Sequence, residues 1–478
     1  MTDPQRSQST VIIGGGLAGL TAALVAKAQG DTVYLVERAA AIGHQWQTIH
    51  SPTGEAFTQG VRIPEVSAIP ELDALLFGNL HNGKWDVFQT ALKEGSIFNN
   101  TLSHVCGCID AALLPDDPFH AGLFQLLQSN TAPTAMHPSW QNAAQQIQDI
   151  YGHTWADTLY RPLMKKYTGL DLENSAVNAY KTFIPQRHRI GDKVLSDRLR
   201  STPLWAQKIA HTTWVDIGNS FGDRFAYPLH GESDSWVDGL VEKARAMGIH
   251  LLTEHQLIQL KTQGDTVTHA VLKPLATTNA TPFDLPVDRF VWTLPTVMLY
   301  PMLQWTYQGT KPPMRDLALI YLTVDGPVGT DTFYVTDYDA NNTLFRVTFL
   351  NNLVGDVPKR PGPNRVVAEV YGEWNTPEER VAMTAQVKAE LNRYGLIPND
   401  APITFERTDV MKNFRPMYTP QTWAETETAY HQVQNNLSNV LLTGRASLTA
   451  YLAPQVFREV YQVLCDSSPQ PLRIPAVA

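Results

Sequence analysis

The sequence predicts an α/β protein that contains more than one domain. The first observation is a strand–turn–helix–strand unit at residues 9–36, in which a β-branched run, a glycine-rich turn, an Ala- and Leu-rich stretch and a second apolar run follow one another. The second is a set of alternating apolar and polar runs within residues 300–430, which is typical of an antiparallel sheet. The third is the length of 478 residues, which suggests two or three domains or one large interlaced unit.

The first turn has the spacing G-x-G-x-x-G, with glycines at positions 14, 16 and 19. Gly14 permits a tight turn, Gly16 lets the backbone approach a pyrophosphate, and Gly19 lets the helix pack closely on the strand. The start of the helix supplies unpaired N–H groups for the phosphates. Glu37, at the end of the second strand, is placed to accept hydrogen bonds from a ribose. The unit therefore predicts a Rossmann-type domain that binds a dinucleotide.

The composition argues against several classes of protein. Lys and Arg number 37 against 46 Asp and Glu, and the net charge of −9 argues against nucleic-acid binding. Apolar runs are shorter than the roughly 18 residues of a membrane span, and the polar first ten residues have no signal-peptide layout. The three cysteines cannot form a disulfide framework. We therefore expect a cytoplasmic protein without a membrane span.

Motifs for metal binding and for other enzyme classes are absent from the sequence. Cys106-Gly107-Cys108 has no second pair of Cys or His at zinc-site spacing. No H-E-x-x-H, G-x-S-x-G or Walker A sequence occurs. The sequence therefore predicts no metal site, and neither a serine hydrolase nor a P-loop protein.

The residues after the second strand carry a family resemblance. Glu37 and Arg38 are followed by Gly43, His44 and Gln45. Together with the glycine turn, this opening resembles the FAD-binding superfamily of amine oxidases, protoporphyrinogen oxidases, phytoene desaturases and UDP-galactopyranose mutases. In that superfamily the acidic–basic pair is followed by Gly-Gly-Arg or Gly-Gly-Asn, of which only the first Gly is kept here. The resemblance implies FAD as the cofactor.

Two middle blocks continue the resemblance. Residues 54–62 are similar to a G-x-x-F-D-x-G hairpin that lies beside the flavin, with Arg62 after Gly60 and Val61. Residues 227–233, with the helix and strand that follow, are similar to a segment that returns to the dinucleotide sheet. In the superfamily, the residue that matches Leu257 contacts the adenine through its backbone.

The last block, residues 439–451, is similar to the mutase branch of the superfamily. Gly444, Arg445 and Tyr451 carry this match, and a helix is expected after Ala453. In the superfamily, this glycine lets the backbone meet the FAD pyrophosphate. The residues that we expect to contact FAD are Gly14, Gly16, Leu17, Ala18, Gly19, Glu37, Arg38, Gly43, His44, Gln45, Trp46, Gly60, Val61, Arg62, Leu257, Thr293, Gly444, Arg445 and Ala453.

The resemblance divides the chain into two interlaced domains. A Rossmann-type, GR2-like FAD-binding domain is assembled from residues 1–75, 225–297 and 435–468. A second, α+β substrate domain takes residues 76–224, expected to be mostly helical, and residues 298–434, expected to form an antiparallel sheet with a helix over 376–393. Residues 469–478 are a peripheral tail.

The candidate catalytic residues are Arg62, His44 and Tyr451. Arg62 matches a position near the flavin, where an Arg would bind an anionic substrate or stabilise a reduced, anionic flavin; a plain salt bridge is the alternative. Its high pKa excludes a role in proton transfer at neutral pH. His44 is suited to proton transfer, with a packing role as the alternative.

Other basic and aromatic residues are candidates for binding the substrate. Arginines bind carboxylates and phosphates through paired hydrogen bonds, and mutases of the superfamily hold a diphosphate with arginines of the second domain. For the neighbours Lys165 and Lys166, placement at the surface is the default expectation; in the alternative, one faces the pocket and the other solvent. The candidate substrate-binding residues are Arg187, Tyr334, Arg346, Arg415 and Tyr418.

The preferred functional hypothesis is an FAD-dependent oxidoreductase, in which a small, anionic substrate gives hydride to flavin N5. The alternative is a redox-neutral isomerase of nucleotide sugars that resembles UDP-galactopyranose mutase and uses reduced flavin. A protein with a purely structural FAD is the third hypothesis. The two enzyme hypotheses imply a small-molecule substrate. A homo-oligomer is compatible with all three hypotheses.

Overall fold

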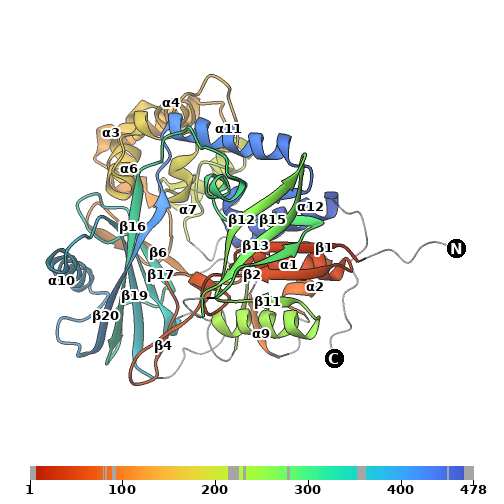
Figure 1. Ribbon diagram of the computed structural model, residues 1–478. Helices are drawn as coiled ribbons and strands as arrows, with labels where there is room; N and C mark the ends of the chain where they lie inside the picture. Colours follow the sequence, from red (N-terminus) through yellow and green to blue (C-terminus); the bar gives the residue numbers. More distant parts are fainter. Residues whose placement is uncertain are drawn as a thin grey trace.

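The computed structural model describes residues 7–78, 80, 83–88, 93–213, 225–229, 233–276, 280–352, 362–448 and 452–467. Figure 1 shows a parallel sheet with its helices beside a larger, mainly antiparallel sheet, with a group of helices above the latter. The described helices are α1 (Leu17–Ala28), α2 (Pro70–Leu76), α3 (Asp116–Gln128), α4 (Ala143–Tyr151), α5 (His153–Trp155), α6 (Arg161–Thr168), α7 (Lys193–Arg200), α8 (Pro203–Ala206), α9 (Ser233–Ala246), α10 (Pro377–Arg393), α11 (Pro420–Asn436) and α12 (Ala453–Ser467).

A five-stranded parallel sheet confirms the predicted α/β fold. Its strands, in spatial order, are β11 (His250–Leu252), β2 (Thr32–Val36), β1 (Ser9–Ile13), β15 (Arg289–Trp292) and β21 (Val440–Leu442). All four pairings are parallel. These strands are short apolar runs because both faces of the sheet are covered. The sheet therefore joins three distant stretches of the chain, while the exact domain boundaries stay a prediction.

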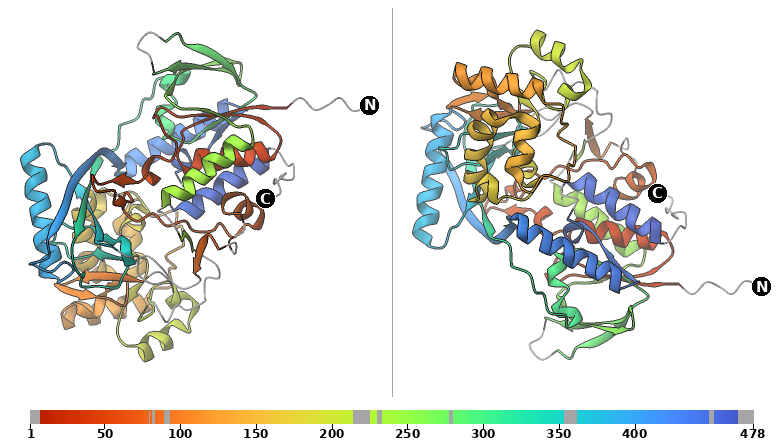
Figure 2. Two further views of the ribbon diagram at one scale, coloured as in Figure 1. Left: turned by 90° about the horizontal axis from the view of Figure 1, so that it is seen from below. Right: turned by 90° about the horizontal axis from the view of Figure 1, so that it is seen from above.

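Helices α1, α9 and α12 lie side by side on one face of this sheet (Figure 2). Leu20, Leu24, Leu240 and Phe457 belong to the apolar core that they form with the strands. The opposite face packs against α11 and a three-stranded antiparallel sheet of β12 (His255–Gln263), β13 (Thr266–Pro274) and β14 (Phe283–Pro286).

A seven-stranded sheet forms the second half of the molecule. Its order is β20 (Ile403–Pro416), β16 (Met314–Val324), β19 (Asn364–Gly372), β18 (Arg346–Phe349), β17 (Tyr334–Asp337), β6 (Glu94–Phe98) and β7 (Thr101–Ser103). Only β17 and β6 pair in parallel. The predicted antiparallel sheet is confirmed, but β6 and β7 come from a stretch that was expected to be mostly helical. Such short strands have too few residues for a clear alternating pattern.

The two faces of this sheet have different neighbours. The helix predicted over residues 376–393 is α10, with Thr376 and Glu379 forming a capping box at its start. α10 packs on the outer face. The inner face holds Tyr321 and Val367 against Phe57, which belongs to the β3–β4 hairpin (Ile49–His50 and Ala56–Phe57) of the N-terminal segment. The inner face therefore packs against the N-terminal segment of the chain, which also supplies β1 and β2 of the parallel sheet.

Helices α3 to α6 form a third apolar core around Trp155, Tyr160 and Tyr167. Two short strand pairs complete the fold: β5 (Trp85–Phe88) with β10 (Phe225–Pro228), and β8 (Ile109–Asp110) with β9 (His188–Arg189). Among the described residues, each helix is too short or too polar to cross a membrane. The same residues contain no group of three or more His, Cys, Asp or Glu side chains that is placed to hold a metal ion.

Candidate functional site

The glycine turn after β1 has the geometry that a dinucleotide requires. Gly14 has a φ of +106°, and a Cβ at Gly19 would lie 1.8 Å from the carbonyl oxygen of Gly14. Glycine at these positions therefore allows α1 to start against the turn. A Cβ at Gly16, by contrast, would meet no atom within 4 Å. The turn is open at the residue whose backbone is expected to face a pyrophosphate.

Glu37 lies beside this turn and is hydrogen-bonded to it. Its carboxylate accepts hydrogen bonds from the backbone N–H of Gly15 at 2.6 Å and of Ala39 at 2.7 Å. A carboxylate has about four lone-pair positions, so acceptor capacity is left for ribose hydroxyls. The neighbouring Arg38 is exposed and makes no ion pair within the described residues.

The segment after β2 is tied to the glycine turn. The N–H of Gly43 donates to the carbonyl oxygen of Gly15 at 2.9 Å. Gly43 and His44 both have positive φ, +112° and +47°. This backbone explains why the superfamily pattern has two glycines here, and His44 adopts it as a non-glycine residue. Trp46 is 7% exposed and packs edge-on against Trp236, so its side chain belongs to the core.

A second turn, after β21, meets the first one. Gly444 has a φ of +64°, and a Cβ there would lie 2.8 Å from the Cβ of Ala18 in α1. Thr293 joins the two turns, because its Oγ1 donates to the carbonyl of Ile13 at 2.7 Å and its carbonyl accepts from the N–H of Arg445 at 3.3 Å. Both turns lie at the carboxyl ends of parallel strands, where open α/β sheets bind their ligands.

Glu459 of α12 holds the second turn in place. Its carboxylate accepts from the hydroxyl of Thr443 at 2.9 Å, from the N–H of Gly444 at 3.1 Å and from the hydroxyl of Ser447 at 2.7 Å. Sequence analysis missed this residue. Its signal is an acidic side chain near the start of the predicted helix, but its partners are known only from the structure.

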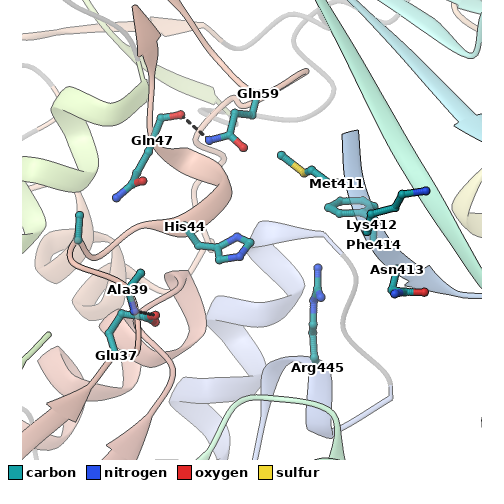
Figure 3. A pocket seen from close by; sticks show the side chains of 11 residues that line it. Glu37, Ala39, His44, Gln47, Gln59, Met411, Lys412, Asn413, Phe414 and Arg445 are labelled. Carbon is teal, nitrogen blue, oxygen red and sulfur yellow. Dashed lines mark hydrogen bonds between the residues drawn. The ribbon is translucent and has the colours of Figure 1, made fainter. Parts of the chain in front are cut away.

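A cavity of about 430 Å³ lies between the glycine turns and β20 (Figure 3). Its wall includes Glu37 and His44 from the N-terminal segment, Gln59 from the 54–62 hairpin, Phe414 from β20 and Arg445. In Figure 3 the His44 ring and the Arg445 side chain extend into the space between these segments. The cavity therefore places residues of three predicted motifs around one volume.

The wall of this cavity carries two cations, Lys412 and Arg445, and one carboxylate, Glu37. Burial lowers the pKa of Arg445, and the guanidinium of Arg415 lowers it further. Its guanidinium carbon lies 5.8 Å from the ring of Phe414. Burial and the charge of Arg445 also lower the pKa of His44, against the opposing effect of Glu37. His44 is therefore a neutral imidazole at pH 7, able to accept a proton.

Arg62 lies in the protein interior without a carboxylate bound to it. It donates from Nε to the carbonyl of Gln45 at 3.0 Å and from Nη1 to the carbonyl of Val61 at 2.8 Å. Burial lowers the pKa of Arg62 to about 10, and Arg346 contributes, although Glu369 opposes the shift. The group thus stays charged at neutral pH. None of the ion pairs in the described part of the chain includes Arg62.

Arg346 has the opposite environment. Its Nε and Nη2 donate to the two carboxylate oxygens of Glu369 at 2.7 and 2.9 Å. Burial alone would lower the pKa of Arg346, but Glu369 outweighs it and raises the pKa. The Glu369 carboxylate fills the space beside Gly60, where a Cβ would lie 2.7 Å from its Cδ. The ring of Tyr334 lies 5.6 Å from the guanidinium carbon of Arg346.

Arg415 lies over two aromatic rings, 5.7 Å from that of Phe183 and 6.0 Å from that of Phe414. Its buried Nε has no hydrogen-bond partner among the described residues. Tyr418 packs edge-on against Trp423 and raises the pKa of Arg445. We call Arg62, Arg415 and Arg445 the three cavity arginines: Arg445 lines the cavity, Arg62 and Arg445 lower the pKa of His44 on its wall, and Arg415 lowers that of Arg445.

The remaining predicted residues have varied positions. Arg187 is exposed and does not line the cavity. Its charge lowers the pKa of Cys108 and of Arg200. Leu257 is buried in β12. Tyr451 lies outside the described residues. Tyr371, which sequence analysis missed, affects the pKa of three arginines: Arg62, Arg346 and Arg445.

Comparisons with known proteins agree with this architecture. Residues 12–72 match the family model of the NAD(P)-binding Rossmann-like domain. A search of curated protein sequences finds no match. The fold is similar to that of a reduced UDP-galactopyranose mutase, with 14% identity over 98% of this chain and 95% of the other and a TM-score of 0.71.

Two amine oxidase structures are also similar. Cyclohexylamine oxidase from Brevibacterium oxydans IH-35A has 13% identity over 97% of this chain and 100% of the other, with a TM-score of 0.61. Putrescine oxidase bound to putrescine has 13% identity over 97% and 99% of the two chains, with a TM-score of 0.60. The resemblance predicted from the motifs is thus confirmed at the level of the fold: residues 12–72 match the Rossmann-like family model, and the chain has a fold similar to that of these mutase and amine oxidase structures.

Proposed function

We propose that this protein is an FAD-dependent oxidoreductase that takes hydride from a small, anionic substrate. The observation that carries the proposal is the pair of joined glycine turns beside a cavity that Arg445 lines, with the charges of Arg62 and Arg415 acting on residues of its wall. The turns match the chemistry of a dinucleotide, and the arginines match that of an anion.

The chain's own groups fit FAD at the turns. The open backbone at Gly16 and the first N–H groups of α1 would bind the pyrophosphate. Glu37 would accept hydrogen bonds from the adenosine ribose. The turn at Gly444 would contact the cofactor from the opposite side of α1. FAD, when bound, supplies the hydride acceptor of the reaction.

The three cavity arginines would bind and orient the substrate. They are charged at neutral pH and have no carboxylate partner among the described residues, unlike Arg346. A carboxylate or phosphate on the substrate would supply the missing negative charge through paired hydrogen bonds. His44, held neutral on the same cavity, would accept a proton from the substrate as it is oxidised.

A redox-neutral isomerase of nucleotide sugars is the second candidate. It is favoured by the Gly444–Arg445 turn at the cavity and by the fold shared with a reduced UDP-galactopyranose mutase. The arginines would then bind the diphosphate of the nucleotide sugar, and reduced flavin would be required.

Anaerobic mixing of the FAD-loaded protein with amines, amino acids and nucleotide sugars distinguishes these functions. An oxidoreductase loses the absorbance of oxidised flavin with its own substrate and no other reductant. An isomerase converts a nucleotide sugar only after chemical reduction of the flavin, with no net oxidation. If neither reaction occurs with any compound, the FAD is structural and both proposals are wrong.

A further inference from the structure

Two of the chain's three cysteines lie together in a turn that the proposed function does not use. Cys106, Gly107 and Cys108 connect β7 to β8 in the second half of the molecule. Cys106 is 6% exposed, and Cys108 is half-buried. The third cysteine, Cys465, lies far along the chain in α12.

The backbone places the two cysteines side by side in one turn. The N–H of Cys108 donates to the Sγ of Cys106 at 3.4 Å, and the Cys106 thiol lies 3.8 Å from the carbonyl oxygen of His211. The peptide groups of the turn are fixed from outside it. Ser96 donates to the carbonyl of Cys106 at 2.9 Å, and Tyr338 donates to that of Gly107 at 3.0 Å. The turn that carries the two cysteines is therefore held by its surroundings.

The two thiols are chemically unequal. The hydrogen bond from Cys108 lowers the pKa of Cys106, with a smaller contribution from Arg189. The same hydrogen bond, together with burial, raises the pKa of Cys108 well above its usual value. Glu94, whose carboxylate lies against Gly107, opposes thiolate formation at both. These effects favour a thiolate at Cys106 over a thiolate at Cys108.

Basic side chains surround the turn. The charge of the exposed Arg187 lowers the pKa of Cys108, and Cys108 raises the pKa of Arg200. Arg189, which forms an ion pair with Asp110, lowers the pKa of Cys106. An anionic reactant is favoured at such a surface over a cationic one.

We propose that Cys106 and Cys108 form a reversible dithiol–disulfide site whose oxidant is an anionic small-molecule disulfide. The Cys106 thiolate attacks one sulfur of the oxidant, a mixed disulfide forms, and one thiolate leaves. Cys108 then loses its proton and attacks the Cys106 sulfur, and the second thiol leaves. The chain loses two electrons and two protons, and one small disulfide becomes two thiols. Excess thiol reverses both steps.

The ring that this disulfide closes contains a single intervening residue. A short, strained ring has a high reduction potential and opens readily, unlike a structural disulfide. The site is therefore expected to respond to the ratio of thiol to disulfide around it.

The test equilibrates the full-length protein with mixtures of reduced and oxidised glutathione, alkylates the remaining thiols and measures the intact mass and peptides. We expect the wild-type protein to lose two alkylation sites together, at Cys106 and Cys108, with no glutathione retained, and to regain both in excess reduced glutathione. Cys465 serves as the internal control. Alkylation of all three thiols in every mixture, or glutathione kept as a stable mixed disulfide, would overturn the proposal.

Single substitutions test the two assigned roles. Cys108→Ser is expected to retain one glutathione at Cys106, because no second thiol displaces it. Cys106→Ser is expected to retain none at Cys108, and Cys465→Ser to behave as the wild type. Equal glutathione retention by Cys106→Ser and Cys108→Ser would refute the assignment of Cys106 as the nucleophile.

The charge of the oxidant is tested with cystamine, which is cationic. Glutathione disulfide should oxidise the pair faster than cystamine at low salt, and Arg187→Gln should slow only the reaction with glutathione disulfide. Equal effects on both reagents would contradict the proposed preference for an anion.

Discussion

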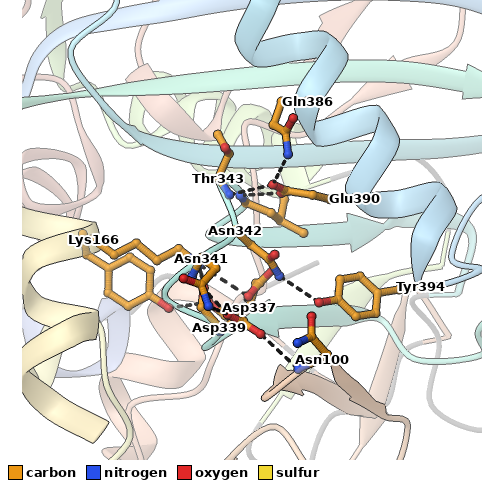
Figure 4. Close-up of polar contacts among 12 residues, drawn as sticks. Asn100, Lys166, Asp337, Asp339, Asn341, Asn342, Thr343, Gln386, Glu390 and Tyr394 are labelled. Carbon is orange, nitrogen blue, oxygen red and sulfur yellow. Dashed lines mark hydrogen bonds and ion pairs between the residues drawn. The ribbon is translucent and has the colours of Figure 1, made fainter. Parts of the chain in front are cut away.

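Two clusters of charged side chains in this molecule differ in how their charges are satisfied. In the second half, Lys166 reaches from α6 to β17 (Figure 4) and donates from Nζ to the carbonyl oxygens of Asp337 and Asp339 at 3.0 and 2.8 Å. The Asp337 carboxylate lies 3.4 Å from the same Nζ and accepts from the amide of Asn342 at 2.7 Å. The three cavity arginines, by contrast, have no carboxylate partner in the described part of the chain.

The difference separates a structural role from a binding role. Burial lowers the pKa of Lys166 and raises the pKa of Asp337 to about 6, so desolvation works against both charges and each depends on its partners. Among the cavity arginines, Arg445 lines a volume of about 430 Å³, and Arg62 donates to backbone carbonyls in place of a carboxylate. We infer that the first cluster stabilises the fold and that the second is completed by a ligand.

The largest effect is expected where the paired cluster is broken. Lys166→Met leaves the Asp337 carboxylate buried without its cation, so the free energy of unfolding should fall by about 3–5 kcal/mol, measured by urea denaturation at pH 7. Lys165→Met is the matched control. The Lys165 side chain is 58% exposed and lies 3.2 Å from Asp171, and its loss should change stability by less than about 1 kcal/mol. Equal losses would contradict the structural role of Lys166.

Arg346, which is paired with Glu369, and Arg445, which has no carboxylate partner among the described residues, should respond differently to replacement by Gln. Arg346→Gln leaves Glu369 buried and unpaired, and the free energy of unfolding should fall by about 3 kcal/mol. Arg445→Gln removes a charge that repels Arg415 and should leave stability within about 0.5 kcal/mol of the wild type. Urea denaturation measures both. A larger loss for Arg445→Gln would show that the cavity arginines are structural.

His188 extends the comparison to a buried titratable group with no charged partner among the described residues. It is fully buried, stacks against Tyr151, Trp155 and Tyr160, and has neither ring nitrogen hydrogen-bonded to a described residue. Burial lowers its pKa from 6.5 to about 4. The unfolded chain therefore binds a proton that the folded chain rejects, and stability falls as the pH drops from about 6.5 to about 4, by about 3 kcal/mol in full.

The measurement compares the pH dependence of unfolding in the wild type and in His188→Leu. The variant should lose this part of the acid slope, whatever its stability at pH 7. An unchanged slope would show that the pKa of His188 is the same in the folded and the unfolded protein.

The smallest effect concerns the cofactor. Gly16→Ala places a methyl group in the open space of the turn without touching other atoms, so stability should hold while FAD affinity falls at least about tenfold, or about 1.4 kcal/mol. Gly239→Ala, in an exposed and equally open position of α9, is the control and should leave FAD affinity unchanged. Titration of apoprotein with FAD measures both. Unaltered affinity in Gly16→Ala would exclude the turn as the pyrophosphate site.

Local features of the sequence predicted local structure well. The strand, glycine turn and helix of residues 9–28 are adjacent in the chain, and the capping box at Thr376 lies within one helical turn. The parallel pairing of β6 with β17 was missed because its partners are more than 200 residues apart and because five residues of β6 show little periodicity.

The burial and the ion pairs of the charged residues depend even more on contacts that are distant in the chain. Placement at the surface was the default expectation for both Lys165 and Lys166, but Lys166 is buried, and its burial follows only from the position of β17. Arg346 was predicted to bind substrate, and its pairing with Glu369 arises from the register of β18 and β19. The number of arginines in the sequence indicated an anion site. The fold determines which of them have a carboxylate partner and which have none among the described residues.

The central claim, that the joined glycine turns hold FAD, is tested most directly by the visible absorption spectrum of the purified protein, followed by the mass of the released cofactor. The account predicts the spectrum of oxidised flavin and the mass of FAD, with uptake of added FAD by any apoprotein. A colourless protein that takes up no FAD would contradict it, and the turns would then serve another dinucleotide or none.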